Sequence, residues 1–175
     1  MSKLAIDPSA IKAFVFDVDG VLSASTLQIG EDGQPIRTTN LHDGYAIRTA
    51  LAKGYKIAVI TGGKTESVIK RCRLLGIEDI FSDSPRKLPV FSKWIESVGL
   101  DASEVAYMGD DIPDLTCLRV AGLSAAPHDA VTEVLQTATF ISKFGGGYGC
   151  ARDLIESVMR AQGTWESSFG PTAAI

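Results

Sequence analysis

The sequence is poor in the residues that bind soft metals and form disulfides. It has two histidines and three cysteines, Cys72, Cys117 and Cys150, in 175 residues. The cysteines are odd in number, widely spaced and set in apolar helical patterns, so we expect buried thiols rather than disulfides. Without a Cys-x-x-Cys pair, zinc has no ligand set. Any bound metal is therefore expected to have oxygen ligands.

Long apolar runs and runs of basic residues are also absent. No stretch approaches the ~20 apolar residues that a membrane-spanning helix needs, and no signal peptide precedes the first predicted strand. The net charge is -4 and the pI is about 5.2. Nucleic-acid binding needs a basic footprint, so nucleic acid is not an expected partner. We expect a cytoplasmic protein that binds neither nucleic acid nor membrane.

The hydrophobic pattern predicts an α/β fold. Short apolar runs alternate with helical periodicity, which is typical of a Rossmann-like parallel sheet with helices on both faces. The length of 175 residues fits one domain, 1–175. The predicted strands lie near 13–17, 56–60, 105–108, 123–125 and 138–141. The predicted helices lie near 43–53, 65–75, 89–98, 112–121, 129–136 and 149–161, and four of them are followed by a glycine, Gly54, Gly76, Gly99 or Gly122.

Two segments depart from this alternation. Residues 22–40 contain two β-prone stretches around a turn cluster at 30–33, which predicts a projecting β-hairpin. The tail 163–175 is too rich in Gly, Pro and Ser to continue a helix, yet it carries Trp165 and Phe169. Aromatic residues in a tail indicate docking onto another surface.

An apolar run ends abruptly in two aspartates. Residues 14–21 read FVFDVDGV, which places Asp17 and Asp19 at the carboxyl end of a buried strand. Open α/β sheets bind ligands at that edge, where two carboxylates suit a metal or a nucleophile. A capped turn is the structural alternative. A calcium-binding EF-hand loop is a poorer match, because its Gly and Glu positions hold Leu22 and Gln28.

Three further polar signals follow along the chain. Thr61 ends a second apolar run, Lys87 precedes a predicted helix, and residues 109–114 read GDDIPD after a third run. Each has an ordinary alternative: a helix cap, a solvated lysine, or a turn. Together and in this order, Asp17-x-Asp19, Thr61, Lys87 and Gly109-Asp110-Asp111-x-x-Asp114 resemble the four signature motifs of the haloacid-dehalogenase superfamily of phosphotransferases.

This constellation indicates phosphoryl transfer through a carboxylate nucleophile. Asp17 is the candidate nucleophile, which would form an aspartyl-phosphate. Asp19 is the candidate acid/base, giving a proton to the leaving oxygen and taking one from water. A phosphate dianion approaches ionised aspartates only if a cation intervenes, and Mg²⁺ is the usual one. The resemblance implies that the Asp17 carboxylate, the Asp19 backbone carbonyl and Asp110 bind this Mg²⁺.

The resemblance also implies roles for the surrounding residues. The Thr61 hydroxyl and the Gly62 amide would bind phosphate oxygens, and Lys87 would neutralise charge that builds in the transition state. Asp111 and Asp114 would orient water ligands and Lys87. Among the basic residues that follow Thr61, Lys64 is the candidate for a substrate contact, and a solvated basic helix face is the alternative for Arg71 and Arg73.

Two other classes of function remain open. Receiver domains of two-component systems also place acidic residues, a Thr and a Lys at strand ends, but in a different order along the chain. A phosphatase-like module without turnover could serve in assembly, although all the chemical residues are present here.

The chain has no insertion large enough to form a lid over the site. Either the substrate is a macromolecule, or another subunit closes the site over a small substrate and excludes water. Four segments resemble the capless tetrameric branch of the superfamily: 43–47 (DGYAI), 61–66 (TGGKTE), 107–114 (YMGDDIPD) and 145–149 (GGGYG). This resemblance implies a homotetramer assembled through hairpins, with tails that enter neighbouring sites. It also implies an acidic sugar phosphate as substrate, 3-deoxy-D-manno-octulosonate 8-phosphate, with a sialic-type nine-carbon sugar acid 9-phosphate as the alternative.

Overall fold

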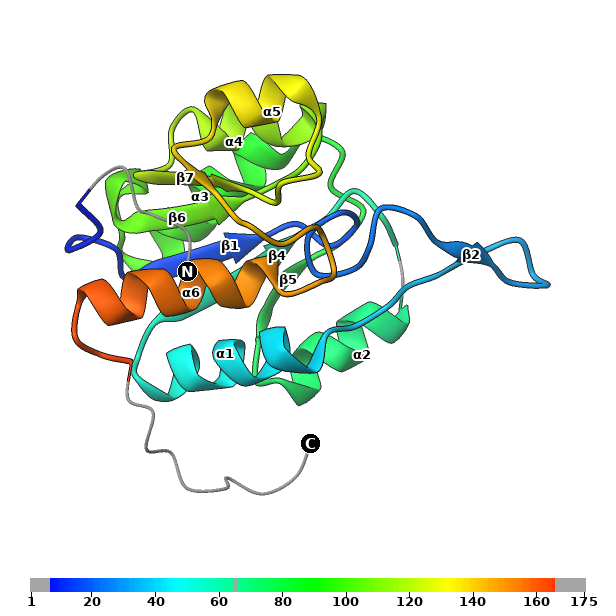
Figure 1. Cartoon of the computed structure of the whole chain (residues 1–175), viewed down its shortest axis with the longest axis horizontal. Helices are drawn as coiled ribbons and strands as arrows, with labels where there is room; N and C mark the ends of the chain where they lie inside the picture. The colour runs from blue at the N-terminus through cyan, green and yellow to red at the C-terminus, as the bar shows by residue number, and fades with distance from the viewer. Residues whose placement is uncertain (1–6, 65, 166–175) are drawn as a thin grey trace.

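A six-stranded parallel sheet forms the centre of the computed structural model, which describes residues 7–64 and 66–165 (Figure 1). The strand order is β5-β4-β1-β6-β7-β8, so the strand that carries the first motif lies inside the sheet. The strands are β1 (Ala13–Phe16), β4 (Lys56–Ile60), β5 (Asp79–Phe81), β6 (Val105–Met108), β7 (Leu123–Ala126) and β8 (Phe140–Ile141).

Both faces of the sheet are covered by helices, as Figure 1 shows. Side chains alternate along β1: Phe14 and Phe16 belong to one hydrophobic cluster, whereas Val15 belongs to the other. The first cluster includes residues of α1 (Leu41–Ala52), α2 (Glu66–Leu74) and α6 (Cys150–Ala161). The second includes residues of α3 (Lys87–Val98), α4 (Leu115–Leu118) and α5 (Thr132–Thr137). The predicted α/β fold with helices on both faces is confirmed.

Some predicted boundaries are wrong. Strand β5 is missing from the predicted strands, because it has only three residues and follows a loop. The helix predicted at 112–121 is a 3₁₀ helix, η2 (Ile112–Asp114), followed by the short α4. A second 3₁₀ helix, η1 (Ala102–Glu104), precedes β6. Gly122 does not end a helix; a Cβ there would lie 2.0 Å from the Ser103 carbonyl oxygen, so close packing excludes a side chain.

Two helices begin earlier in the chain than predicted. Helix α1 begins at Leu41, because the Asn40 side chain accepts hydrogen bonds from the backbone N–H groups of His42 and Asp43. Helix α3 begins at Lys87, with Pro89 in its first turn, where a missing N–H costs little. The second shift places Lys87 at the first position of a helix.

The predicted hairpin is present and projects from the body of the molecule (Figure 1). Its strands are short, β2 (Gln28–Ile29) and β3 (Pro35–Ile36), and they pair in antiparallel register. Ile29 and Ile36 are 68% and 55% exposed, respectively. The hairpin therefore carries apolar side chains that the described chain leaves in contact with solvent.

The start of the tail packs against two helices. The Trp165 ring contacts the Tyr45 ring of α1 edge-on, with centroids 6.2 Å apart. The guanidinium groups of Arg152 and Arg160 on α6 also lie over the Trp165 ring. The rest of the tail, including Phe169, lies outside the described residues, so its predicted docking stays a prediction.

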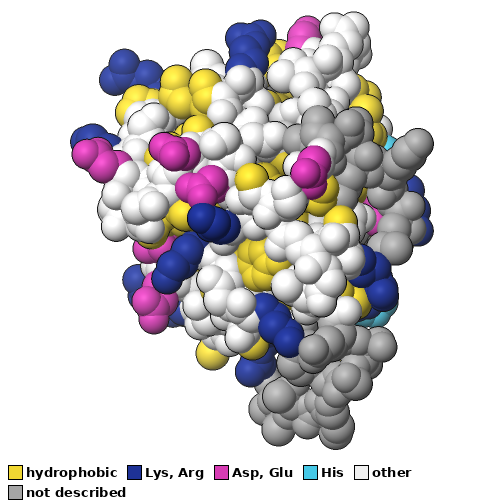
Figure 2. Space-filling view, turned by 90° about the vertical axis from the view of Figure 1, so that its left-hand side faces the viewer, with side chains coloured by type: hydrophobic (Ala, Val, Ile, Leu, Met, Phe, Trp, Pro, Cys, Tyr) yellow, Lys and Arg dark blue, Asp and Glu magenta, His cyan; other side chains and the backbone are white. Residues whose placement is uncertain are grey.

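Figure 2 shows the side of the molecule at the left of Figure 1, where acidic and basic side chains are interspersed around small hydrophobic areas. On this face, the described Lys and Arg residues do not gather into one patch. Between Asp7 and Trp165, leaving out residue 65, no helix is both long and apolar enough to span a membrane.

Candidate active site

The predicted motifs meet in one open cavity of about 460 Å³ at the carboxyl ends of β1, β4 and β6. Parallel strands bring their carboxyl ends to the same edge, so motifs far apart in sequence become neighbours. The cavity is lined by eight predicted site residues, Asp17, Asp19, Thr61, Gly62, Lys87, Asp110, Asp111 and Asp114. Lys64 is exposed and does not line this cavity.

Asp17 lies at the end of β1 and is 7% exposed. Its Oδ1 accepts a hydrogen bond from the Val18 N–H at 2.7 Å, and its Oδ2 lies 2.9 Å from the Lys87 Nζ. Burial and the negative charge of Asp114 raise the pKa of Asp17 to about 6, although Lys87 and the Val18 N–H oppose the shift. The carboxylate is therefore held in place in a site that disfavours uncompensated negative charge.

Lys87 bridges two buried carboxylates. Its Nζ lies 2.9 Å from Asp17 Oδ2 and donates a hydrogen bond to Asp114 Oδ1 at 2.8 Å. Burial disfavours the charged amine, but Asp17 and Asp114 together raise the pKa of Lys87 above its ordinary value. A buried ammonium between two carboxylates is positively charged at neutral pH, as charge neutralisation at phosphate requires.

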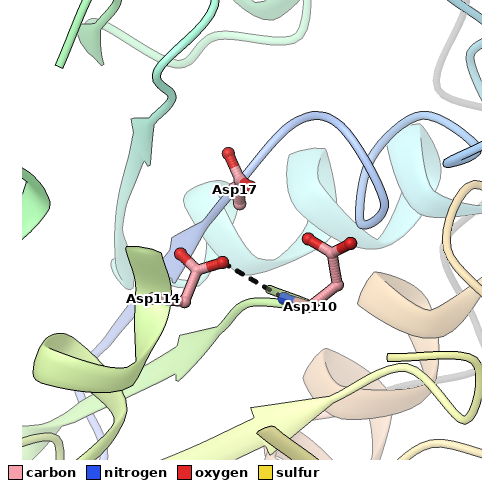
Figure 3. A group of neighbouring side chains, drawn as sticks. All are labelled: Asp17, Asp110 and Asp114. Carbon is pink, nitrogen blue, oxygen red and sulfur yellow. Dashed lines mark hydrogen bonds between the residues drawn. The ribbon is translucent and has the colours of Figure 1, made fainter. Parts of the chain in front are cut away.

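Asp114 is saturated with donors from the protein. Its Oδ1 accepts from Lys87 and from the Tyr107 hydroxyl at 2.8 Å, and its Oδ2 accepts from the Asp110 N–H at 3.2 Å (Figure 3). The contact of Tyr107 with Asp114 was not predicted, since Tyr107 occupies an interior strand position. Asp114 therefore contacts Lys87 directly, whereas Asp111 caps η2 through the Ile112 N–H.

Asp110 differs from Asp114 in having an oxygen without a partner. Its Oδ1 is buried and has no hydrogen-bond partner among the described residues. Burial and the charges of Asp17, Asp114 and Asp111 raise the pKa of Asp110 to about 7. One ligand oxygen from each of Asp17, Asp110 and Asp114 lies within 4.8 Å of the others. These hard oxygen donors fit Mg²⁺, and Asp17 and Asp110 are the candidate ligands because Asp114 already accepts hydrogen bonds at both of its oxygens.

Two glycines allow close packing beside this acidic cluster. A Cβ on Gly20 would lie 1.9 Å from Asp110 Oδ2, and the φ angle of Gly20 is +82°. A Cβ on Gly146 would lie 1.9 Å from the Gly20 carbonyl oxygen, so the 145–149 segment packs directly against the first motif. These contacts explain why both segments need glycine.

Asp19 faces the hairpin rather than the sheet. Arg37, just after β3, donates from Nε to Asp19 Oδ1 and from Nη2 to Asp19 Oδ2, both at 2.7 Å. Arg37 belongs to the second β-prone stretch of the predicted hairpin, and its contact with Asp19 was not predicted. The available signal was that Arg37 is the only basic residue in the predicted hairpin 22–40.

Thr61 follows β4 and is 6% exposed. Its hydroxyl oxygen accepts a hydrogen bond from the Gly63 N–H at 3.2 Å, which leaves the hydroxyl proton available for a phosphate oxygen. Ser25 and Ser84 also line the cavity and were not predicted. The arrangement offers a held carboxylate, a buried cation, hydroxyl donors and an oxygen-rich metal site, which together suit phosphoryl transfer.

Comparisons with known proteins agree with this chemistry. Residues 37–122 match the family model of haloacid dehalogenase-like hydrolases. The 3-deoxy-D-manno-octulosonate 8-phosphate phosphatase of Escherichia coli is 35% identical over 160 residues, covering 91% of this chain and 85% of that protein.

Solved structures agree as well. A probable YrbI family phosphatase from Pseudomonas syringae is 41% identical, with a TM-score of 0.90 over 94% of both chains. The 3-deoxy-D-manno-octulosonate 8-phosphate phosphatase of Moraxella catarrhalis, solved with a magnesium ion, a phosphate ion and a KDO molecule, is 29% identical. Its TM-score is 0.87, over 91% of this chain and 92% of that chain. The predicted family is confirmed: this chain belongs to the 3-deoxy-D-manno-octulosonate 8-phosphate phosphatase family of haloacid dehalogenase-like hydrolases.

Proposed function

We propose that this protein is a cytoplasmic, Mg²⁺-dependent phosphatase that releases phosphate from 3-deoxy-D-manno-octulosonate 8-phosphate in lipopolysaccharide sugar biosynthesis, as one domain spanning 1–175. The observation that carries the chemistry is the buried Asp17–Lys87 pair beside the unpartnered oxygen of Asp110. The substrate is supported by the 35% identity to the Escherichia coli phosphatase and by the Moraxella catarrhalis structure, which holds a KDO molecule.

The reaction has two steps in this site. An Asp17 carboxylate oxygen forms a bond to phosphorus and the bond from phosphorus to the sugar oxygen breaks. Asp19, which enters this step protonated, gives the sugar oxygen its proton and becomes a carboxylate. Water then attacks phosphorus, Asp19 takes its proton, and the bond to Asp17 breaks. Phosphate leaves and both aspartates return to their starting states.

The residues around Asp17 bind the phosphate and compensate its charge. The Thr61 hydroxyl and the Gly62 N–H donate to phosphate oxygens, and Lys87 neutralises negative charge as it builds. Asp17, the Asp19 backbone carbonyl and Asp110 hold the Mg²⁺. When bound, Mg²⁺ neutralises the charge that the phosphate and the carboxylates share. Lys64 stays a proposed substrate contact, from an exposed position outside the cavity.

A phosphate-release screen against sugar phosphates tests this function. We expect multiple turnovers on 3-deoxy-D-manno-octulosonate 8-phosphate with Mg²⁺ and none after the metal is removed. Faster turnover on a nine-carbon sugar acid 9-phosphate would reassign the substrate. Uptake of about one phosphoryl group per chain without turnover would instead indicate a receiver.

We further propose a homotetramer assembled through the hairpin, with the tail closing a neighbouring site. The exposed Ile29 and Ile36 and the short strand edges of the hairpin support assembly, because other copies would cover them. Trp165 supports the tail's role, since its packing against Tyr45 fixes where the tail leaves the body.

Two measurements test the assembly. Light scattering at assay concentration should give the mass of four chains, and a fully active monomer would contradict the tetramer. A chain ending at Trp165 keeps the aromatic packing and removes only the residues beyond it. Unchanged kinetics in that chain would refute the role of the tail and leave the tetramer standing.

A further inference from the structure

The ion pair between Arg37 and Asp19 joins the hairpin to the proposed acid/base. Two parallel hydrogen bonds of 2.7 Å connect the guanidinium and the carboxylate. Such a fork fixes the plane of the carboxylate as well as its position. The Arg37 side chain is 10% exposed and the Asp19 side chain is 38% exposed, so the pair is shielded on the arginine side and open on the aspartate side.

The backbone beside Arg37 is anchored to the segment that follows Asp19. The Thr38 N–H donates to Ser23 Oγ at 2.9 Å, and the Ala24 N–H donates to Thr38 Oγ1 at 3.1 Å. The base of the hairpin is therefore tied to the first motif through two hydrogen bonds next to Arg37. Movement of the hairpin base would carry the guanidinium with it.

Gly63 provides the space that the pair occupies. A Cβ at this position would lie 3.0 Å from Arg37 Nη2 and 3.4 Å from Asp19 Oδ2. The loop after β4, which also carries Thr61, therefore passes directly beside the ion pair. Three segments that are distant in sequence meet at the Asp19 carboxylate.

We propose that Arg37 is a positioning residue for the reaction: it holds the Asp19 carboxylate beside the phosphate loop and makes proton transfer depend on the place of the hairpin. This inference rests on the proposed function, because it assigns Asp19 the proton transfer. An aspartate side chain has two rotatable bonds, and without the fork Asp19 can turn toward the open side of the cavity. Any contact that other copies make with the hairpin then acts on the reaction through Arg37.

The dependence of the rate on the leaving group tests this role. In Arg37→Ala we expect kcat/KM for an alkyl sugar phosphate to fall roughly 10–100-fold, as is typical when the partner of a functional group is removed. The loss for p-nitrophenyl phosphate should be smaller, because p-nitrophenolate leaves without a proton. KM for both substrates and the Mg²⁺ concentration for half-maximal activity should stay close to wild type.

Two further variants complete the experiment. Arg37→Lys keeps the charge but loses the planar fork, so its loss should be intermediate and should depend on the leaving group in the same way. Arg73→Ala, an exposed arginine on α2, removes the same charge and should behave like wild type. If Arg37→Ala does not fold, Arg37→Lys decides the question.

Three outcomes would overturn the proposal. They are unchanged kcat/KM in Arg37→Ala, wild-type leaving-group dependence in Arg37→Lys, and an equal loss on both substrates with a raised KM, which would make Arg37 a phosphate-binding residue. A wild-type enzyme that hydrolyses p-nitrophenyl phosphate but not the octulosonate phosphate would refute only the proposed substrate. The comparison then uses the alkyl phosphate that the substrate screen identifies.

Discussion

Asp17 and Asp19 are two residues apart, yet the fold gives them different neighbours. Asp17 is buried at the end of β1, and its cation, Lys87, comes from the helical layer that packs on the sheet. Asp19 is partly exposed, and its cation, Arg37, comes from a hairpin outside the sheet. The proposed nucleophile is thus positioned by the core, whereas the proposed acid/base depends on a peripheral element.

The strongest test of this difference replaces each aspartate by its amide. Asp17→Asn should lower phosphate release on the order of 10⁴-fold or more on every substrate, because an amide cannot attack phosphorus. Asp19→Asn should retain more kcat/KM on p-nitrophenyl phosphate than on an alkyl phosphate, because only the alkoxide needs a proton. Steady-state phosphate release measures both variants. Normal turnover in Asp17→Asn would contradict the assignment of the nucleophile.

Removal of the metal should affect the buried carboxylates around Asp17. Exhaustive EDTA treatment should abolish activity and added Mg²⁺ should restore it, because the buried carboxylates repel a phosphate dianion without a cation. Mg²⁺ should also raise the melting temperature of the wild type, but not that of Asp110→Asn. Glu96→Gln, which alters an exposed carboxylate on α3, should still show the rise in melting temperature with Mg²⁺. An equal shift in Asp110→Asn would remove Asp110 from the metal site.

The Lys87 ion pairs should contribute more to the free energy of unfolding than an exposed charge does. Lys87→Met leaves Asp17 and Asp114 buried without their cation, so the free energy of unfolding should fall by about 3–5 kcal/mol at pH 7. The folded-state pKa of Lys87 is raised, so its contribution is fully present below the ordinary value of 10.5 and is lost as pH rises through the folded pKa. Chemical denaturation against the exposed control Lys93→Met measures the difference, and equal stabilities would contradict it.

Asp43 provides a third environment. It is a buried carboxylate with a hydrogen bond to only one of its two oxygens. Its Oδ1 accepts from the Arg152 N–H at 2.7 Å, whereas its Oδ2 has no hydrogen-bond partner among the described residues. Burial raises the pKa of Asp43 from 3.8 to about 6, against the opposing effect of the Arg152 N–H. The folded state therefore binds more protons than the unfolded state between these values, and the wild type loses stability as pH rises through this window.

Asp43→Asn should remove that loss. Relative to the wild type, the variant should gain about 2–3 kcal/mol in free energy of unfolding between pH 4 and pH 8, since one pKa unit corresponds to about 1.4 kcal/mol. Denaturation curves at both pH values measure the gain, with Glu96→Gln as the control. If the variant and the wild type have the same free energy of unfolding at both pH values, Asp43 is not a buried charged carboxylate.

The residues that line the candidate site were predictable because their backbone positions are local features of the sequence. Asp17, Thr61 and Asp110 each follow an apolar strand, so the parallel sheet alone brings them to one edge. Tyr107 and Arg37 could not be found in this way. Tyr107 occupies an interior strand position like any core residue, and its contact with Asp114 depends on where η2 places that aspartate.

The strand and helix boundaries that were predicted wrongly share a physical cause. Strand β5 has three residues, too few for a periodic pattern, and it becomes a strand by pairing with β4. The predicted helix 112–121 divides where the Asp111 and Asp114 side chains cap a 3₁₀ turn. In both places a tertiary or capping contact outweighs a weak local preference.

By itself, the sequence determined the α/β fold, the order of the four motifs and the family, because apolar periodicity and residues at strand ends are local properties of the chain. The tertiary structure decided the partners of those residues: which carboxylate is saturated, which keeps an unpartnered oxygen, and which cation reaches Asp19. Ion pairs depend on distances of a few ångströms between residues far apart in the chain, as Arg37 and Asp19 show at 2.7 Å. Such distances are set only when the hairpin, the sheet and the phosphate loop have packed together.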